Sequence, residues 1–270
     1  MWGEPCLVDP GTGVYASDPA WRDHFRGTAA HSTVTVDAAG QAVATGPFAW
    51  RDLPRARLRR WISNDRFDLA DAEHDAYRRL PDPVTHRRRV LFVRPRYWVV
   101  VDDLVGREEH RIEARFQFAP LHVAERPDGW VSAVDSRGRG MFLRAFGGAR
   151  LGQRIVEGSI EPRQGWVSPD YGKCRPSPVL ILSASARLPL RILTLLVPKA
   201  READAPPEVS VWRREGERPE GLIFGPNEET VVFEEDGVRF DPPPTISALT
   251  PISPVDGRPS RPGTSSTTGV

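Results

Sequence analysis

Short runs of β-branched and aromatic residues, separated by tight turn sequences, follow one another along most of this chain. Such runs favour extended strands, and Gly, Pro and Asp clusters favour the turns between them. The predicted strands are Ser32–Val36, Val90–Val93, Tyr97–Val101, Arg111–Phe118, Gly140–Phe146, Val179–Leu182, Leu190–Val197, Val209–Trp212, Gly221–Phe224 and Thr230–Phe233. This pattern predicts an all-β fold, a large antiparallel β-sandwich.

One strand, Arg111–Phe118, shows the alternation most clearly. Apolar residues occupy its even positions and polar residues its odd positions. Because successive side chains point to opposite faces of a sheet, this segment is predicted to be half-buried. Helical patterns are scarce; Asp18–Arg26 is the exception, with Ser17 or Asp18 as N-cap and Pro19 in the first turn.

The C-terminal stretch has a different composition. Residues 241–270 are rich in Pro, Ser, Thr and Gly and poor in large apolar residues. Such a segment buries too little surface to offset its chain entropy, so a disordered tail is predicted. The sequence therefore predicts one β-sandwich domain over residues 1–240 and a tail over residues 241–270.

The charge pattern excludes some partners. The formal net charge is +1, which gives no reason to expect a nucleic-acid partner. Nearly all positive charge is arginine, either from a GC-rich genome or because planar guanidinium groups suit the carboxylates and sulfates of an anionic glycan. Cys6 and Cys174 lack metal-type spacing and are expected to be free thiols. No apolar run predicts membrane insertion, and the first residues show no export signal.

Three segments in order resemble the C-terminal domain of heparinase II/III-like polysaccharide lyases. The first comprises LVDPGTGVY at 7–15 and DPAWRDHFRGTAAHSTVTVD at 18–37, similar to the family's aspartate-glycine turn, arginine-rich link and Ala-His-(Asn/Ser)-Thr-Val strand. The second comprises HDAY at 74–77 and HRRRVLFVRPRYWVVVDDL at 86–104, similar to paired strands that end in a double aspartate. The third is GWVSPDYG at 165–172, similar to a loop near the family's substrate cleft.

The resemblance implies one half of a two-part enzyme. In that family a helical toroid supplies a tyrosine and an asparagine or histidine, and the β-sandwich closes the cleft with another histidine. The reaction is β-elimination: a base removes the C5 proton of a uronate while donors neutralise its carboxylate. The toroid is absent from this sequence, so little activity is expected of the chain alone. The resemblance also implies a periplasmic or secreted location.

Four residues are the candidate site. The resemblance assigns His31 as the catalytic histidine; the alternative is a strand-end histidine bonded to backbone. Arg22 and Arg26 are candidates for binding an acidic sugar, or else ordinary surface arginines. Tyr171 is a candidate for stacking on or bonding to a sugar, or else a loop residue that covers the edge of the core.

Other polar residues are interpreted as structural. No zinc site and no cofactor are predicted, because Thr33 stands where some family members have a zinc-binding histidine. His74 and His86 are interpreted as sheet-surface or strand-end residues, and residues 86–89 as a solvated strand edge that could also contact an anionic glycan. Asp102 and Asp103 are interpreted as turn-closing. His24, His110 and His122 show no recognisable pairing.

The predicted function is therefore the C-terminal domain of a lyase that acts on uronate-containing acidic polysaccharides, completed by a helical toroid in the same or a partner chain. One alternative is a non-catalytic carbohydrate-binding module or partner-dependent subunit. Another is a decayed gene product that keeps a fold without a function. The sequence does not identify the polysaccharide.

Overall fold

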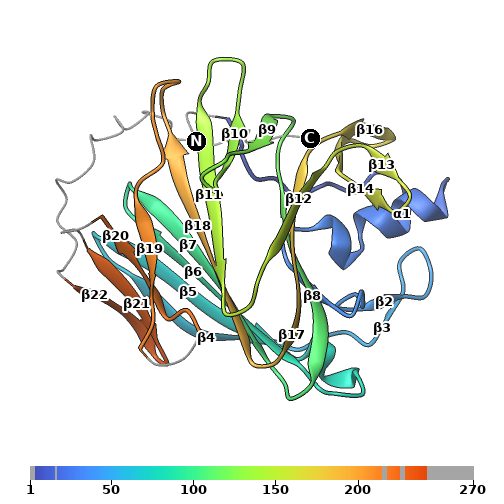
Figure 1. Ribbon diagram of the computed structural model, residues 1–270. Helices are drawn as coiled ribbons and strands as arrows, with labels where there is room; N and C mark the ends of the chain where they lie inside the picture. The colour runs from blue at the N-terminus through green and yellow to red at the C-terminus, as the bar shows by residue number, and fades with distance from the viewer. Residues whose placement is uncertain (1–3, 16, 215–217, 226–228, 242–270) are drawn as a thin grey trace, which may run out of the picture.

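The computed structural model is built around one eight-stranded antiparallel sheet, called the central sheet here (Figure 1). The structure describes all residues except 1–3, 16, 215–217, 226–228 and 242–270. The strands of the central sheet are, in spatial order, β4 (Ala56–Ser63), β5 (Phe67–His74), β6 (Thr85–Val93), β7 (Tyr97–Val105), β18 (Leu190–Lys199), β11 (Gly140–Gly147), β10 (Val131–Val134) and β9 (His122–Glu125).

Two four-stranded sheets cover the two faces of the central sheet. The inner sheet contains β1 (Val34–Val36), β8 (Glu109–Gln117), β17 (Val179–Arg187) and β12 (Gly152–Val156). The C-terminal sheet contains β19 (Val209–Trp212), β20 (Gly221–Phe224), β21 (Thr230–Glu234) and β22 (Gly237–Asp241). The predicted antiparallel β-sandwich is confirmed, with a third layer added by the C-terminal sheet. Most of the predicted tail lies outside the described residues.

The alternating strand β18 explains the three layers. Its even positions, such as Ile192 and Leu196, join the hydrophobic core shared with the inner sheet. Its odd positions, such as Leu193 and Leu195, join the core shared with the C-terminal sheet. A strand buried on both faces is apolar at most positions, as Leu190–Val197 is apart from Arg191 and Thr194.

A helix and three short hairpins form a lobe beside the inner sheet (Figure 1). The elements are α1 (Pro19–Phe25), the 3-10 turn η1 (Thr28–Ala30), β2 (Val43–Ala44), β3 (Trp50–Arg51), β13 (Ser159–Ile160), β14 (Arg163–Gln164), β15 (Trp166–Asp170) and β16 (Lys173–Pro176). Asp18 caps α1 as predicted, its Oδ1 accepting from the backbone N–H of Ala20 at 2.9 Å. Trp21 then packs edge-on against Trp166 at 5.0 Å between ring centroids, which ties the helix to the hairpins.

The interpretation of residues 86–89 as a solvated strand edge is wrong. Strand β6 lies between β5 and β7 and is covered on both faces, so Arg89 is fully buried and His86 is 2% exposed. The turn-closing role of Asp102 and Asp103 is also wrong. Both carboxylates are buried within β7, where Asp102 binds Arg88 and Asp103 binds Arg89. The adjacent aspartates do face opposite sides of the sheet, and each neutralises an arginine of β6 there.

The polar side of β8 differs from the prediction as well. Glu113, Arg115 and Gln117 were expected to face water, but they are only 2–6% exposed. They form hydrogen bonds within the protein instead. Arg115 Nη1 donates to Thr35 Oγ1 at 2.8 Å, and Gln117 Nε2 donates to the Ser177 carbonyl at 3.2 Å. From Ile112 to Gln117, strand β8 is therefore buried on both faces, because polar partners replace water on one of them.

His110, for which the sequence shows no recognisable pairing, bridges two carboxylates. Its Nδ1 lies 2.7 Å from Asp37 Oδ2 and its Nε2 lies 2.9 Å from Asp82 Oδ2. Burial lowers the pKa of His110, but the hydrogen bonds to Asp82 and Asp37 outweigh burial and raise it above its ordinary value. Since carboxylate oxygens only accept, both ring nitrogens carry a proton when both contacts are made, and the ring then joins the start of β8 to Asp37 and Asp82.

This bridge predicts a pH dependence of stability. A folded-state pKa raised above the unfolded value of 6.5 contributes stability that is fully present below pH 6.5 and is lost as pH rises through the folded pKa. We expect the melting temperature of the wild type to fall over this window. His110→Gln should melt lower at pH 6 and show a flatter profile, whereas the exposed His122→Gln should keep the wild-type profile. Parallel profiles for His110→Gln and wild type would contradict the bridge.

Candidate active site

His31 stands at the junction between the 3-10 turn η1 and strand β1. Its Nδ1 lies 3.0 Å from Asp9 Oδ2, and the side chain is 34% exposed. Since a carboxylate oxygen only accepts, Nδ1 carries a proton in this contact, and Nε2 is the nitrogen on the far side of the ring from Asp9. The alternative of a histidine side chain bonded to backbone is not what the structure shows. The ring is thus held by a carboxylate on one side and is partly exposed to solvent.

A glycine-rich segment connects Asp9 with the other candidate residues. It runs along the β15–β16 hairpin: the backbone N–H of Ser168 donates to the Pro10 carbonyl at 2.6 Å, and that of Gly172 donates to the Gly13 carbonyl at 2.8 Å. Gly11 has a φ of +83°, and a Cβ there would lie 2.3 Å from the Ser168 carbonyl oxygen. Glycine is therefore required for the close approach that holds Asp9 beside His31.

Tyr171 lies at the tip of this hairpin, within a group of exposed aromatic rings. Tyr171 is 59% exposed, Tyr15 is 49% exposed and Phe48 is 78% exposed. The ring of Tyr15 lies 5.4 Å from that of Tyr171 and 5.9 Å from that of Phe48, between centroids. We call these three residues the aromatic surface. Tyr171 does not cover the edge of the core, and exposed rings of this kind offer apolar faces to a ligand.

Arg26 organises the loop that carries Phe48. Its Nη2 donates to the Ala49 carbonyl at 3.0 Å and its Nη1 to the Pro47 carbonyl, while its guanidinium carbon lies 4.0 Å from the centroid of the Trp50 ring. With its side chain 15% exposed, Arg26 is not an ordinary surface arginine. Its positive charge is nevertheless held close to the aromatic surface.

Arg22 is committed to its neighbour in the helix. Its Nε and Nη2 donate to the two carboxylate oxygens of Asp23 at 2.9 and 3.1 Å, and its side chain is 11% exposed. This bidentate pair lowers the pKa of the Asp23 carboxyl through the Arg22 hydrogen bond. The structure therefore places Arg22 in the same lobe as Arg26. Its Nε and Nη2 groups, however, already donate to Asp23.

The sequence did not identify His24, Tyr15, Phe48 and Trp50 as neighbours of the candidate site. His24 packs against Trp21 at 5.9 Å, and its Nε2 is buried without a hydrogen-bond partner. Burial, aided by nearby positive charge, lowers the pKa of His24 to about 4, so its ring is neutral at physiological pH. The signal that could have found the aromatic residues was their placement in glycine-containing loops beside the recognised motifs, where large apolar side chains are unusual.

The position of a possible metal ligand is occupied by hydrogen-bonding groups. Thr33 Oγ1 accepts from Gln41 Nε2 at 3.1 Å, and Gln41 Nε2 also lies 3.3 Å from His74 Nε2. His74 in turn contacts His86 at 2.9 Å, and His86 contacts Asp102 at 2.7 Å. His74 and His86 are thus members of one buried chain of contacts, not separate surface residues. Across the described ranges, no group of three or more His, Cys, Asp or Glu residues could hold a metal ion.

Two further expectations concern the cysteines and membrane insertion. Cys6 and Cys174 are free, Cys6 buried and Cys174 exposed. Among the described residues, no helix is both long and apolar enough to cross a membrane.

Curated relatives match this chain over part of their length. A heparin-sulfate lyase of Bacteroides stercoris is 25% identical over 214 residues, which cover 76% of this chain and 29% of the relative. A heparin-sulfate lyase of Pedobacter heparinus is 23% identical over 163 residues, which cover 58% of this chain and 23% of the relative. The chain thus spans less than a third of the length of these relatives.

Solved structures share the fold. The heparan sulfate lyase HepC from Pedobacter heparinus superposes with a TM-score of 0.65 at 20% identity, covering 88% of this chain and 34% of that one. A structure of Heparinase III gives a TM-score of 0.65 at 17% identity, covering 88% and 33%. The family described as Heparinase II/III-like, C-terminal, matches residues 1–217. This chain therefore belongs to the heparinase II/III-like family, of which it carries the C-terminal domain.

Proposed function

We propose that this chain forms the β-sandwich half of the active site of a lyase that cleaves uronate-containing acidic polysaccharides by β-elimination. The observation that carries the proposal is the exposed His31–Asp9 pair, held in the same lobe as Arg26 and the aromatic surface. The curated relatives that support it are heparin-sulfate lyases. Heparan-type, alginate-type and other uronate glycans all offer the group that such a site would act on.

The chemistry assigns a limited role to His31. In β-elimination a base takes the C5 proton, the electron pair forms the C4–C5 double bond, and the C4–oxygen bond breaks as the leaving oxygen gains a proton. The Nε2 of His31 would either take part in these proton transfers or, when protonated, neutralise the uronate carboxylate. Asp9 would hold the imidazole in position, and the aromatic surface would contact the neighbouring sugar faces.

The remaining catalytic groups would come from outside the described residues. By the family resemblance these are a tyrosine and an asparagine or histidine of a helical toroid, carried by the same polypeptide or by a partner chain. We therefore propose that the 270-residue chain binds acidic polysaccharide with little turnover. A periplasmic or secreted location would bring it to such substrates.

The test combines binding and turnover on the purified chain. Heparan sulfate and alginate are titrated at low and high salt, and the ultraviolet absorbance of unsaturated uronate is followed in the same samples. We expect salt-sensitive binding to at least one polymer, with little product. Arg26→Ala should weaken binding by about ten-fold, since it removes a charge and loosens the loop of Phe48. Binding to neither polymer at low salt would refute the proposal.

A second candidate function is a non-catalytic binding module. The three exposed rings favour it, because they need no catalytic partner to hold a glycan. The two functions differ in their dependence on His31. If the native polypeptide that carries this chain yields unsaturated uronate and His31→Ala removes that activity, the lyase is supported; binding without turnover in that native polypeptide supports the module.

A further inference from the structure

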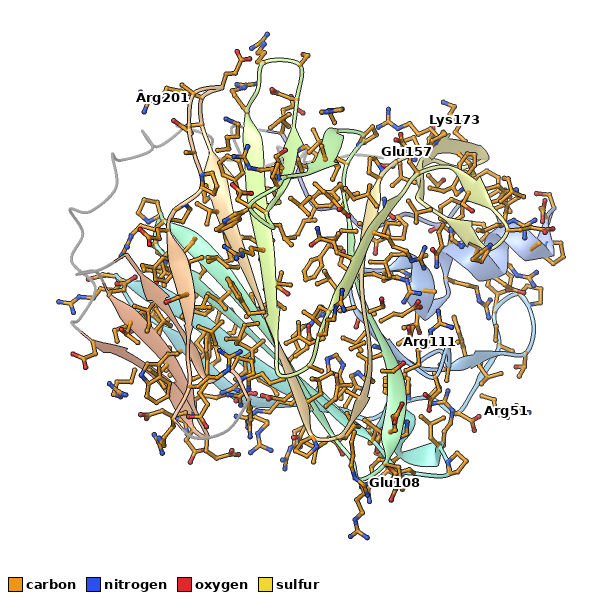
Figure 2. All side chains as sticks on the ribbon, in the orientation of Figure 1. Arg51, Glu108, Arg111, Glu157, Lys173 and Arg201 are labelled. Atoms are coloured by element: carbon orange, nitrogen blue, oxygen red, sulfur yellow. The ribbon has the colours of Figure 1, made fainter. Side chains whose placement is uncertain are left out.

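A cluster of arginines surrounds an open cavity on the outer face of the inner sheet, outside the candidate active site. The cavity measures about 290 Å³ and is lined by Arg111, Glu113, Arg150, Gly152, Arg154, Ser183, Ala184 and Ser185. Figure 2 labels Arg111 beside β8. The cavity size is close to the lower end of the range for small-ligand sites.

The strand register explains why these side chains meet. On β17, Ser183 lies directly opposite Glu113 of β8 and Gly152 of β12. Ser185 is paired with Arg111 in the same way, so residues at alternate positions share one face. Gly152 has no side chain, and a Cβ at this position would lie 2.8 Å from Ser183 Oγ. The missing side chain therefore leaves the floor of the cavity open between the arginines.

The charges in the cavity are unbalanced. Glu113 contributes the one carboxylate among the lining residues, and it already contacts Arg111 at 2.9 Å, Arg154 at 3.7 Å and the buried Arg115. Arg154 Nη1 also donates to Gln164 Oε1 at 3.4 Å, but Arg111 and Arg154 remain 64% and 46% exposed, so part of each guanidinium group is still open to solvent. Arg150 adds a third exposed guanidinium. The arrangement offers planar donors and two serine hydroxyls to an anion.

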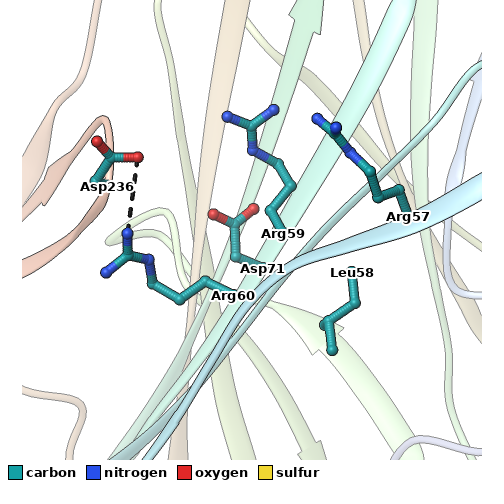
Figure 3. Close-up of a pocket in the computed structure, with 6 residues that line it drawn as sticks. All are labelled: Arg57, Leu58, Arg59, Arg60, Asp71 and Asp236. Carbon is teal, nitrogen blue, oxygen red and sulfur yellow. Dashed lines mark ion pairs between the residues drawn. The ribbon is translucent and has the colours of Figure 1, made fainter.

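A second arginine-rich cavity serves as a contrast. It is lined by Arg57, Leu58, Arg59, Arg60, Asp71 and Asp236. Figure 3 shows the three arginines on one side of β4, where the bulge between Leu58 and Arg60 places them, and Leu58 on the other. Here each arginine lies beside a carboxylate. Glu73 binds Arg57 and Arg59, and Asp236 lies 3.9 Å from Arg60. This cavity holds a balanced ion-pair network, and it leaves little positive charge for a ligand.

The arginine cavity is aligned with the candidate active site along β8. The backbone N–H of Gln117 donates to Ser32 Oγ at 3.0 Å, which places His31 near the Gln117 end of the strand. Glu113 and Arg111 lie four and six residues further along β8, which corresponds to about 13–20 Å at the usual rise per residue. That separation fits two anionic groups a few sugar units apart on one chain.

We infer that Arg111, Arg150 and Arg154, together with Ser183 and Ser185, form a distal subsite for a sulfo or carboxylate group of the same acidic polysaccharide whose uronate lies at His31. The inference rests on the proposed function and extends it to a second contact point. Bidentate guanidinium–oxyanion bonds supply direction as well as charge, so this subsite would set the register of the glycan relative to His31.

The experiment is a binding titration of the purified chain with heparan sulfate oligosaccharides. The double variant Arg150→Gln, Arg154→Gln is compared with the control Arg66→Gln, Arg137→Gln, which removes the same charge from exposed turns elsewhere. We expect the cavity variant to lose about ten-fold or more in affinity and the control to stay within about two-fold of wild type. Gly152→Ala, which fills the floor without changing charge, should also bind more weakly. Thermal melting verifies that all variants are folded.

The outcomes separate this inference from the proposed function. If wild type binds but the cavity variant matches the control, the distal subsite is refuted while the proposed function stands. If wild type binds no acidic polymer, the proposed function itself fails. Repeating the titration with desulfated heparan sulfate identifies the bound group. If the cavity variant loses affinity only for the sulfated polymer, the group is a sulfo group. If it loses affinity equally for both polymers, the group is a carboxylate.

Discussion

Replacing Asp103 by alanine is expected to lower the free energy of unfolding by about 3–5 kcal/mol, among the largest effects of any single substitution in this chain. Asp103 Oδ2 accepts from Arg89 at 2.7 Å, and its two oxygens accept from Arg191 at 2.5 and 3.1 Å. Arg89 is fully buried and Arg191 is 4% exposed. Without Asp103, the guanidinium groups of Arg89 and Arg191 would stay between the central and C-terminal sheets, and among the described residues neither forms an ion pair with another carboxylate.

The electrostatics support this expectation. Burial alone would raise the pKa of Asp103, but Arg191 and Arg89 overcome it and keep the pKa below its ordinary value. Burial lowers the pKa of Arg89 to about 10, which still leaves it protonated at neutral pH. The cluster is therefore fully charged in the folded state, and its stability depends on the central carboxylate.

Urea unfolding at 25 °C measures the effect. The control is Asp236→Ala, which removes a carboxylate that is 78% exposed and 3.9 Å from Arg60. A surface ion pair of this kind contributes about 0–1 kcal/mol, so the control should unfold almost as wild type does. If Asp103→Ala lowers the free energy of unfolding no more than this control does, the buried cluster does not hold the two sheets together.

The second large effect concerns catalysis. In the native polypeptide that carries this chain, His31→Gln is expected to lower the rate of unsaturated uronate formation by about 10²- to 10⁴-fold, the usual contribution of a general acid or base. Glutamine keeps a polar group of similar size beside Asp9 but cannot exchange a proton at neutral pH. Because His31 is partly exposed, the substitution should leave the free energy of unfolding almost unchanged.

Two further variants sharpen this test. Asp9→Asn should lower the rate less than His31→Gln does and should alter its pH profile, since Asp9 acts through the orientation of the imidazole. His122→Gln, in exposed strand β9, should keep full activity. Activity of His31→Gln equal to that of His122→Gln would remove His31 from the catalytic site and leave the binding module as the better explanation.

Much of the fold was predictable from local sequence. Period-two alternation and turn residues identified the strands that became β1, β6–β8, β11 and β17–β21. The cap at Asp18 predicted the single α-helix of the described residues, because a side-chain acceptor followed by proline is a local signal. Strands β4 and β5 were not predicted, because their charged residues hide the alternation, as in the ARLRRWIS sequence of β4.

Local residue patterns predicted most strands, and the family motifs marked His31 as a candidate. The packing of the sheets, in contrast, set what covers each strand face and which distant residues meet. Arg89 looked like a surface residue because alternation assigns a side chain to a face without saying whether a third sheet covers that face. His31 and Asp9, like Tyr15 and Tyr171, lie far apart in sequence, and no local preference encodes their contact. Such pairs form only when buried surface in all three layers fixes the relative positions of the loops.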